Sequence, residues 1–327
     1  MPRDGLPQPA LSVLVLNHNY ARFLPECLDS ILAQSFDDYE IIVIDDVSTD
    51  DSAAILRTYE SEPRVRVVLH DVNRGFVASL VEGTGELSNG EFLTVVSADD
   101  FVLERDAFSL QVAKMRADAN LVACLSAYTK IGPGEGRSVR RPLRGDCVIA
   151  GDELIRSLLT AREFTILQTG TIVRAEAYLR AGGYRQDLDN YVDLAMWVAL
   201  GHAGPVAYTD RPLYGYRVHA AQLSGSSTRR REVLREGLAL LRQAARSAQA
   251  AGIDVRPSKV LRARISDLAL ADAFAGRRVR ALQRCADAAA IAPLAALTAS
   301  GWWIALVRSI AGARGWDAIV RIRRRMY

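Results

Sequence analysis

Lysine and cysteine are scarce in this sequence of 327 residues, and each shortage excludes a class of protein. Only 3 of the 41 basic residues are lysine, and no reader motif accompanies the arginines, so we expect no nucleic-acid partner. The 4 cysteines show neither CxxC nor CxH spacing. This spacing argues against a zinc site or a disulfide framework and predicts free thiols in a reducing cytosol.

Long apolar runs are missing from the first 290 residues. The N-terminal stretch has one early arginine and a short apolar run before Asn17, too short for the core of a signal peptide. No later run in this part approaches the ~18 apolar residues that predict a transmembrane helix. With 50% hydrophobic and 24% charged residues, the composition is that of a globular protein, which we expect in the cytoplasm.

The net charge of +3 conceals two parts of opposite charge. Residues 1–225 carry 21 Lys+Arg and 31 Asp+Glu, a net charge of −10, whereas residues 226–327 carry 20 and 7, a net charge of +13. Since domains average about 150 residues, the length also suggests two domains. We therefore expect an acidic domain over 1–225 and a basic region over 226–327.

Strand-like apolar runs alternate with helix-like segments through the first half. The strand-like runs are rich in Val, Ile and Leu and lie at 11–16, 40–45, 64–69, 91–96 and 120–127. Helices are expected between them, near 22–34, after Ser48-Thr49, near 75–88 and near 104–117. This alternation predicts a doubly wound α/β fold with a parallel sheet covered on both faces.

The second half has a less regular pattern. Residues 131–146 are rich in Gly, Pro and Arg, which predicts a mobile loop whose arginines are solvated; a lid over an anionic ligand is the alternative. Beyond this loop, strand-like runs are expected at 165–173 and in PVAYT and LYGYRV, with a helix over 188–201 between them.

The basic C-terminal part shows helical periodicity. A first apolar stripe has 4-3-4-3 spacing and consists of Leu234, Leu238, Leu241, Ala245 and Ala248; a second begins at Leu261, Ile265 and Leu268. Residues 291–307 carry no charge and precede a segment rich in Arg and Trp. An interfacial segment on anionic lipid is favoured, and a buried helix that packs on the body is the alternative.

Polar residues collect where the predicted strands end. Asn17-His18-Asn19 follow the first strand, Asp45-Asp46 the second, and Ser97-Ala98-Asp99-Asp100 the fourth. Ligands of open α/β sheets bind at this edge, and a divalent cation on a diphosphate would compensate the paired carboxylates. Each pair alone could simply begin a helix, but two pairs directly after buried strands favour a site.

Phosphate-binding glycine motifs are absent from the sequence. Neither GxGxxG after the first strand nor GxxxxGK[ST] occurs. A nucleotide bound here would therefore have its phosphates held by a metal ion and by basic side chains.

The run LSVLVLNHNYARFLPECLDSILAQSFDDYEIIVIDDVSTDDS resembles the start of a family 2 glycosyltransferase with the GT-A fold. NRG (73–75), GEF before SADD, GGY (182–184) and YRVH (216–219) follow in the order typical of that family. The resemblance covers about residues 10–225. It implies a GT-A type doubly wound, mostly parallel sheet flanked by helices as the catalytic domain, followed by a C-terminal α-helical extension.

The resemblance implies a donor site for a UDP-, GDP- or dTDP-sugar. Asp46 would accept a hydrogen bond from the nucleobase, and Arg217 would close over the diphosphate. The other residues placed at the donor by the resemblance are Asn17, His18, Asn19, Ser97 and Asp99.

The resemblance also implies a metal site and a general base. Mg²⁺ or Mn²⁺ would be held at Asp99, with Asp100 beside it, and His219 would close over the metal from the C-terminal side. Asp193 would deprotonate a hydroxyl of a glycan or lipid-linked acceptor, and a single displacement would invert the anomeric configuration. Assembly of a bacterial cell-surface polysaccharide at the inner face of the membrane is the expected role.

The sequence departs from the family pattern at four positions. His18 replaces an aromatic residue, Ser97 replaces the first acid of the DxD motif, and Leu80 replaces an arginine. Val192 replaces the acid that often precedes the catalytic aspartate, which makes Asp189 a second candidate base. A catalytically silent nucleotide-sugar-binding protein or scaffold is therefore the main alternative. A nucleotidyltransferase would require the Gly-rich phosphate loop that is absent.

Overall fold

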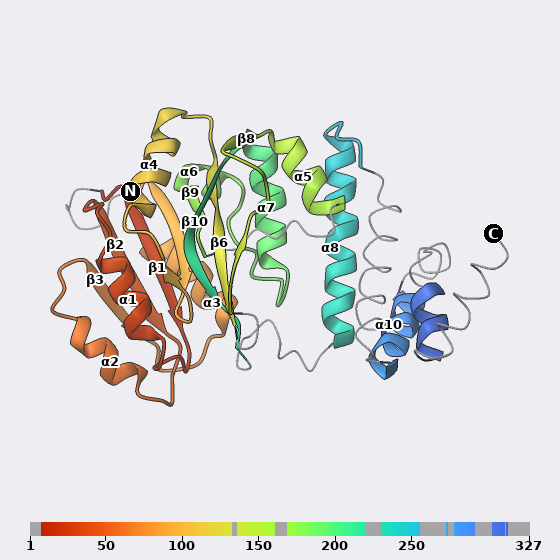
Figure 1. Cartoon of the computed structure of the whole chain (residues 1–327), viewed down its shortest axis with the longest axis horizontal. Helices are drawn as coiled ribbons and strands as arrows, with labels where there is room; N and C mark the ends of the chain where they lie inside the picture. The colour runs from red at the N-terminus through yellow and green to blue at the C-terminus, as the bar shows by residue number, and fades with distance from the viewer. Residues whose placement is uncertain are drawn as a thin grey trace. The chain divides into compact units, whose positions relative to one another are not determined.

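The computed structural model describes residues 8–132, 136–160, 169–219, 230–255, 273, 278–291, 303–310 and 312 (Figure 1). The chain divides into two compact units. The first comprises Met1–Leu158 and Glu163–Ser226, and the second comprises Leu159–Arg162 and Ser227–Tyr327.

The N-terminal half of the first unit is a parallel sheet in the order β3-β2-β1-β4. Its strands are β1 (Leu11–Asn17), β2 (Tyr39–Asp45), β3 (Val65–Leu69) and β4 (Phe92–Ser97). Every residue of β1 is buried, as expected for a strand covered on both faces. The apolar runs therefore predicted these strands correctly, and the strand ends that bear polar residues lie at one edge.

Helices cover both faces of this parallel sheet. The helices α1 (Leu24–Leu32), α2 (Ser52–Tyr59) and α4 (Ala107–Ala117) supply residues to a core on one face. On the opposite face, the side chain of Leu14 contacts the segment formed by α3 (Phe76–Val81) and η1 (Glu82–Leu87). The helix expected near 75–88 thus forms, but its second half is a π-helix.

The second half of the unit adds strands of both directions. They are β5 (Phe101–Val102), β6 (Ala123–Gly132), β7 (Gly136–Arg140), β8 (Cys147–Ile149), β9 (Ile172–Arg174) and β10 (Val206–Arg217). Among the described residues the sheet runs β3-β2-β1-β4-β9-β6-β10-β5, with β7 on β6 and β8 on β10. Because β9 is antiparallel to both β4 and β6, the complete sheet is mixed.

The prediction of a loop over 131–146 was wrong for residues 131–132 and 136–140, which belong to β6 and β7. Strand β7 pairs antiparallel with β6, from Tyr128 opposite Arg140 to Gly132 opposite Gly136. Its Arg137 and Arg140 are exposed, and charged side chains are typical of edge strands because they prevent further pairing. Backbone pairing with β6 therefore outweighs the loop-like composition.

The runs PVAYT and LYGYRV form one strand, β10, instead of two. Register shifts at Thr209 and Pro212 mark an irregularity, as expected where proline cannot donate to the ladder. The remaining helices of the unit are α5 (Gly151–Thr160), α6 (Ala175–Arg180) and α7 (Val192–Ala203). Residues 161–168 lie outside the described residues, and they include the first four residues of the strand-like run expected at 165–173.

The second unit is helical in its described residues. It contains α8 (Arg230–Ala250) and α10 (Arg278–Ile291), and residues 303–310 are also helical. The predicted stripe on α8 is buried at Leu238, Leu241, Ala245 and Ala248. Residues 261–268 of the second stripe lie outside the described residues. Among the helices described, none is long and apolar enough to cross a membrane.

Candidate functional site

The loops after β1 and β2 are tied together by Asp45. Its carboxylate accepts hydrogen bonds from Asn17 Nδ2 at 2.6 Å and from the Ser48 backbone N–H at 2.9 Å. The Ser48 hydroxyl also donates to Asp45 and accepts from the Asn19 N–H at 2.8 Å. These contacts place the predicted residues Asn17 and Asn19 beside the end of β2.

In the part of the chain that the structure describes, three non-glycine residues have a positive φ, and each is a predicted site residue or lies within two positions of one. They are Asn19 at 61°, Val47 at 60° and Tyr191 at 55°. Asparagine tolerates this region, but a β-branched valine there is strained. Such strain persists only where the surroundings impose it, and it is enriched at functional sites. The surrounding structure thus holds the backbone in a strained conformation next to Asp46 and two residues before Asp193.

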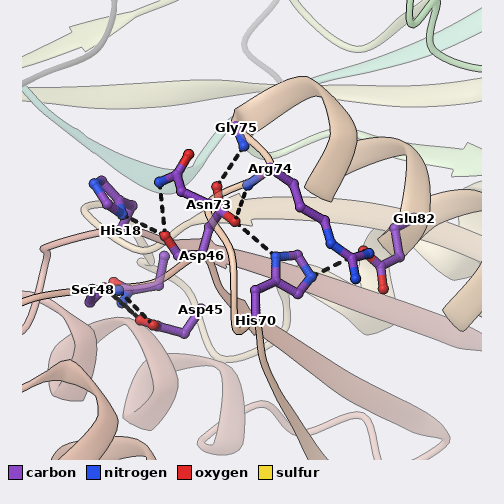
Figure 2. A network of polar contacts seen from close by, with 10 residues as sticks. His18, Asp45, Asp46, Ser48, His70, Asn73, Arg74, Gly75 and Glu82 are labelled. Atoms are coloured by element: carbon purple, nitrogen blue, oxygen red, sulfur yellow. Dashed lines mark hydrogen bonds and ion pairs between the residues drawn. The ribbon is translucent and has the colours of Figure 1, made fainter.

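Asp46 is buried at the end of β2, and backbone and side-chain donors converge on it (Figure 2). Its Oδ1 lies 2.8 Å from His70 Nδ1 and accepts the Arg74 N–H at 2.8 Å, while Oδ2 accepts the Gly75 N–H at 2.7 Å. Burial raises the pKa of Asp46, but these hydrogen bonds outweigh it, so the pKa lies below its usual range. The carboxylate is therefore a fixed, ionised acceptor.

The backbone oxygen of Asp46 also has partners from two loops. His18 Nδ1 lies 2.8 Å from it, and Asn73 Nδ2 donates to it at 3.0 Å. His18 itself is exposed. The structure therefore brings His18 next to Asp46.

Asp99 faces His219 across the end of the sheet. Asp99 Oδ2 lies 3.0 Å from His219 Nε2, although the two residues are 120 positions apart in the chain. The imidazole packs against the rings of Tyr20, at 5.6 Å between centroids, and Phe23, at 4.8 Å. Residues from three distant segments thus hold this pair in place.

Asp100 is turned into the protein. Its Oδ2 accepts the Thr169 hydroxyl at 2.8 Å, and its Oδ1 accepts the Arg217 N–H at 2.9 Å. Burial, and then the neighbouring charge of Asp99, raise the pKa of Asp100 to about 7. Both of its oxygens are therefore engaged by donors of the protein.

The Arg217 side chain lies against the same pair of aspartates. Its Nη1 donates to the Asp99 carbonyl oxygen at 2.7 Å, and its Nη2 pairs with Glu26. The guanidinium stacks on Phe101 at 4.5 Å. Ser97 lies nearby, since its N–H donates to the Thr169 hydroxyl at 3.2 Å. Asp99, Asp100, Arg217, His219 and Ser97 thus form one cluster.

Asp193 lies in the first turn of α7, apart from the hydrogen bonds of that cluster. Its Oδ1 is buried without a hydrogen-bond partner in the described part of the chain. Burial alone raises the pKa of Asp193 to about 6. Trp197, one turn later, is only 2% exposed and is therefore a core residue.

The donor set of the cluster suits a divalent cation. Asp99 supplies a carboxylate oxygen and His219 an imidazole nitrogen, both ligands that Mn²⁺ accepts. Among the described residues, no group of three or more His, Cys, Asp or Glu could hold a metal ion together. Ligation by Asp100 would require it to release Thr169 or the Arg217 N–H. The cluster thus offers two side chains, Asp99 and His219, whose chemistry suits a divalent cation.

Sequence reasoning missed two residues that the structure brings to the site. His70 directly follows β3 and contacts Asp46, but it was not among the expected site residues. The same strand-end rule that singled out Asp46 would have found it. Thr169 carries no comparable signal, because only the fold brings it to Asp100.

Several known proteins are similar to this chain. Chondroitin synthase of Escherichia coli is 27% identical over 217 residues, which cover 66% of this chain and 30% of that protein. The uncharacterized glycosyltransferase YibD of E. coli K12 is 29% identical over 226 residues, which cover 65% of this chain and 63% of YibD. The chain therefore spans less than two thirds of the length of these relatives.

Solved structures share the fold at low sequence identity. TarS 1–349 of S. aureus in complex with UDP superimposes with a TM-score of 0.64 and 16% identity, covering 97% of this chain and 92% of that one. The mannosyltransferase PcManGT of Pyrobaculum calidifontis, in complex with GDP-Man and Mn²⁺, superimposes with a TM-score of 0.55 and 23% identity. The match covers 91% of this chain and 81% of that one. These matches confirm the expected GT-A type fold.

The family model for glycosyl transferase family 2 matches residues 12–178, about half of the chain. This stretch contains the ends of β1, β2 and β4, with Asp46 and Asp99. The chain belongs to glycosyl transferase family 2.

Proposed function

We propose that this protein transfers a sugar from a nucleotide-diphosphate donor to a hydroxyl of a glycan or lipid-linked acceptor, with inversion of the anomeric configuration. The observation that carries the proposal is the meeting of Asp99 and His219 at 3.0 Å at the sheet edge of a family 2 chain. Solved structures of similar fold contain UDP, UDP-GlcNAc or GDP-Man, which supports a nucleotide-sugar donor.

The donor binds along the ends of β1, β2 and β4. Asp46 accepts a hydrogen bond from the nucleobase, because its carboxylate is ionised and held in place. The donor-binding residues around it are Asn17, His18, Asn19, Ser97, Asp99 and Arg217. Asn17 Oδ1 is buried without a partner among the described residues, which leaves one acceptor free for the donor.

Asp99 and His219 would hold a divalent cation, Mg²⁺ or Mn²⁺. When bound, the cation supplies a Lewis acid that neutralises charge on the leaving group. Arg217, anchored on the Asp99 carbonyl oxygen, places a fixed positive charge beside it. Asp100, the third expected ligand, would join only after giving up one of its two hydrogen bonds.

Asp193 is the general base. Its pKa of about 6 lets it be ionised at neutral pH and still accept a proton effectively. It takes the proton of the acceptor hydroxyl as that oxygen bonds to the anomeric carbon, while the bond to the diphosphate breaks. Attack from the face opposite the leaving group inverts the anomeric centre.

The second unit attaches the enzyme to an anionic membrane surface. In the helical residues 303–310, Trp303, Val307 and Ile310 are 45%, 39% and 64% exposed and share one face, whereas Ala305 and Ser309 are buried. Arginines follow this helix in the sequence. Exposed apolar side chains flanked by arginines suit the interface of anionic lipid. At such a membrane the enzyme takes part in the assembly of a cell-surface polysaccharide on the cytoplasmic face.

Release of nucleoside diphosphate tests the proposal. The full chain is incubated with UDP-, GDP- and dTDP-sugars and Mn²⁺, with and without saccharide acceptors. We expect one donor to yield its nucleoside diphosphate, and the Asp99→Asn variant to lose the release. A catalytically silent binding protein would be stabilised against heat by the donor but would release no nucleoside diphosphate. That result would contradict the proposed activity.

A further inference from the structure

His70 lies between two carboxylates in the network shown in Figure 2. Its Nδ1 is 2.8 Å from Asp46 Oδ1, and its Nε2 is 3.0 Å from Glu82 Oε2. Its side chain is only 2% exposed. The carboxylate of Asp46 is ionised and can only accept hydrogen bonds, so Nδ1 carries the hydrogen of that contact. The ring thus bridges the end of β2 to the π-helix η1.

Glu82 is joined to Asp46 by a second route as well. It accepts a hydrogen bond from Arg74 Nη1 at 2.9 Å. The backbone N–H of the same Arg74 donates to Asp46 Oδ1. His70 and Arg74 therefore both connect Asp46 to Glu82.

The acceptor capacity of Asp46 is nearly used up by the protein. A carboxylate offers about four lone-pair positions, two on each oxygen. His70 and the Arg74 N–H occupy both positions of Oδ1, and the Gly75 N–H occupies one position of Oδ2. One position on Oδ2 is left for a ligand.

We infer that His70 is a positioning residue that makes Asp46 select a nucleobase with one hydrogen-bond donor on its pairing edge, uracil or thymine, and reject guanine. This inference rests on the proposed binding of a nucleotide donor at Asp46. Uracil and thymine present a single N3–H between two carbonyl groups, which matches the single free position. Guanine presents N1–H and N2–H side by side, and the second needs the oxygen that His70 and Arg74 already occupy.

Two substitutions at His70 separate its two contacts. In His70→Asn, the side-chain amide can reach the position of Nδ1 and donate to Asp46 while the Glu82 contact is lost. In His70→Gln, the amide reaches the position of Nε2, so the donor to Asp46 Oδ1 is lost. The exposed His202 on α7 supplies the control His202→Gln.

The experiment is isothermal titration of the full chain with UDP, dTDP and GDP in the presence of Mg²⁺. We expect the wild type to bind UDP or dTDP at least about tenfold more tightly than GDP, since a buried unpaired donor costs about that much. His70→Gln should weaken UDP binding by about tenfold and reduce the ratio of GDP to UDP dissociation constants. His70→Asn and His202→Gln should keep the ratio within about threefold of wild type.

The ratio of dissociation constants does not depend on how much of a variant is folded, so a merely structural role of His70 would leave it unchanged. An unchanged ratio in His70→Gln, or GDP binding as tight as UDP binding in the wild type, would overturn the inference and leave the proposed function standing. Binding of none of the three nucleotides would overturn the proposed function itself.

Discussion

The carboxyl groups of Asp46, Asp100 and Asp193 titrate in three different environments. Hydrogen bonds that outweigh burial lower the pKa of Asp46, whereas burial and the charge of Asp99 raise that of Asp100 to about 7. Burial alone raises the pKa of Asp193 to about 6. Such divergent values within one fold are typical of functional sites. They suit a permanent acceptor at Asp46 and a proton acceptor at Asp193.

The first prediction concerns the pH dependence of turnover. Because the base must be ionised, kcat should rise with pH through about 6 and then level off. Below that value it should fall about tenfold per pH unit. The check is nucleoside diphosphate release at saturating donor between pH 5 and 8. A rate that does not change over this interval would contradict the assignment of Asp193.

The second prediction concerns the stability of Asp193→Asn. The pKa of Asp193 is raised in the folded state from 3.8, so its favourable contribution is present below pH 3.8 and is lost as pH rises through about 6. The side-chain amide in Asp193→Asn does not ionise, so the variant does not lose this stability as pH rises. At pH 8 the variant should therefore be more stable than wild type by about 1–3 kcal/mol, and the difference should shrink as pH falls towards about 4. Urea denaturation at both pH values measures it, and a variant less stable at pH 8 would refute it.

The π-helix η1 packs closely on the sheet, and this packing brings Glu82 into the network around Asp46. Glu82 is its first residue, and the next residue, Gly83, lies against the side chain of Leu14 on β1. A Cβ at Gly83 would overlap that side chain, which is 1% exposed and enclosed by the core. The glycine thus lets η1 approach the sheet closely enough for Glu82 to reach His70.

The third prediction compares two glycines of η1. Gly83→Ala should destabilise the fold by about 1–3 kcal/mol, because the added methyl group overpacks the core against Leu14. Gly85→Ala is the matched control, since a Cβ there has no neighbour within 4 Å, and it should cost less than about 0.5 kcal/mol. Chemical denaturation of both variants measures the difference. Equal stabilities would mean that Leu14 moves aside.

Elements whose residues carry a local signal were predictable from the sequence. The strand β1 is an unbroken apolar run, and Asp46 directly follows another such run. The strand β7 was not predictable, because its pairing with β6 depends on the backbone and its arginines look like a loop. Asp100 was identified, but its contacts with Thr169 and Arg217 come from segments about 70 and 117 positions away.

The whole chain combines an acidic unit that contains the site with a basic helical one. The carboxylates of the proposed site account for only part of the net negative charge of residues 1–225. Most charged residues of 226–327 are arginines. Among the described residues of the second unit, exposed apolar side chains gather on the helix 303–310. Membrane attachment through this helix would bring the catalytic unit to a lipid-linked acceptor.

The fourth prediction tests this attachment with the full chain. Wild type should float with vesicles that contain anionic phosphatidylglycerol but not with neutral phosphatidylcholine vesicles. Replacing both Trp303 and Ile310 with Ser should lower the floated fraction several-fold. Val279→Ser on α10 is the control, because Val279 is 70% exposed but lies outside this helix. Equal flotation of all variants would remove the membrane role of residues 303–310.

In the proposed reaction, Asp193 activates a hydroxyl for attack on a nucleotide sugar held at the edge of the sheet. The most direct test compares wild type and Asp193→Asn in one preparation of donor and Mn²⁺, with nucleoside diphosphate release and the donor Kd both measured. We expect release by the variant to fall by about 10²-fold or more while its Kd stays within about threefold of wild type. Unchanged release by Asp193→Asn would contradict the account.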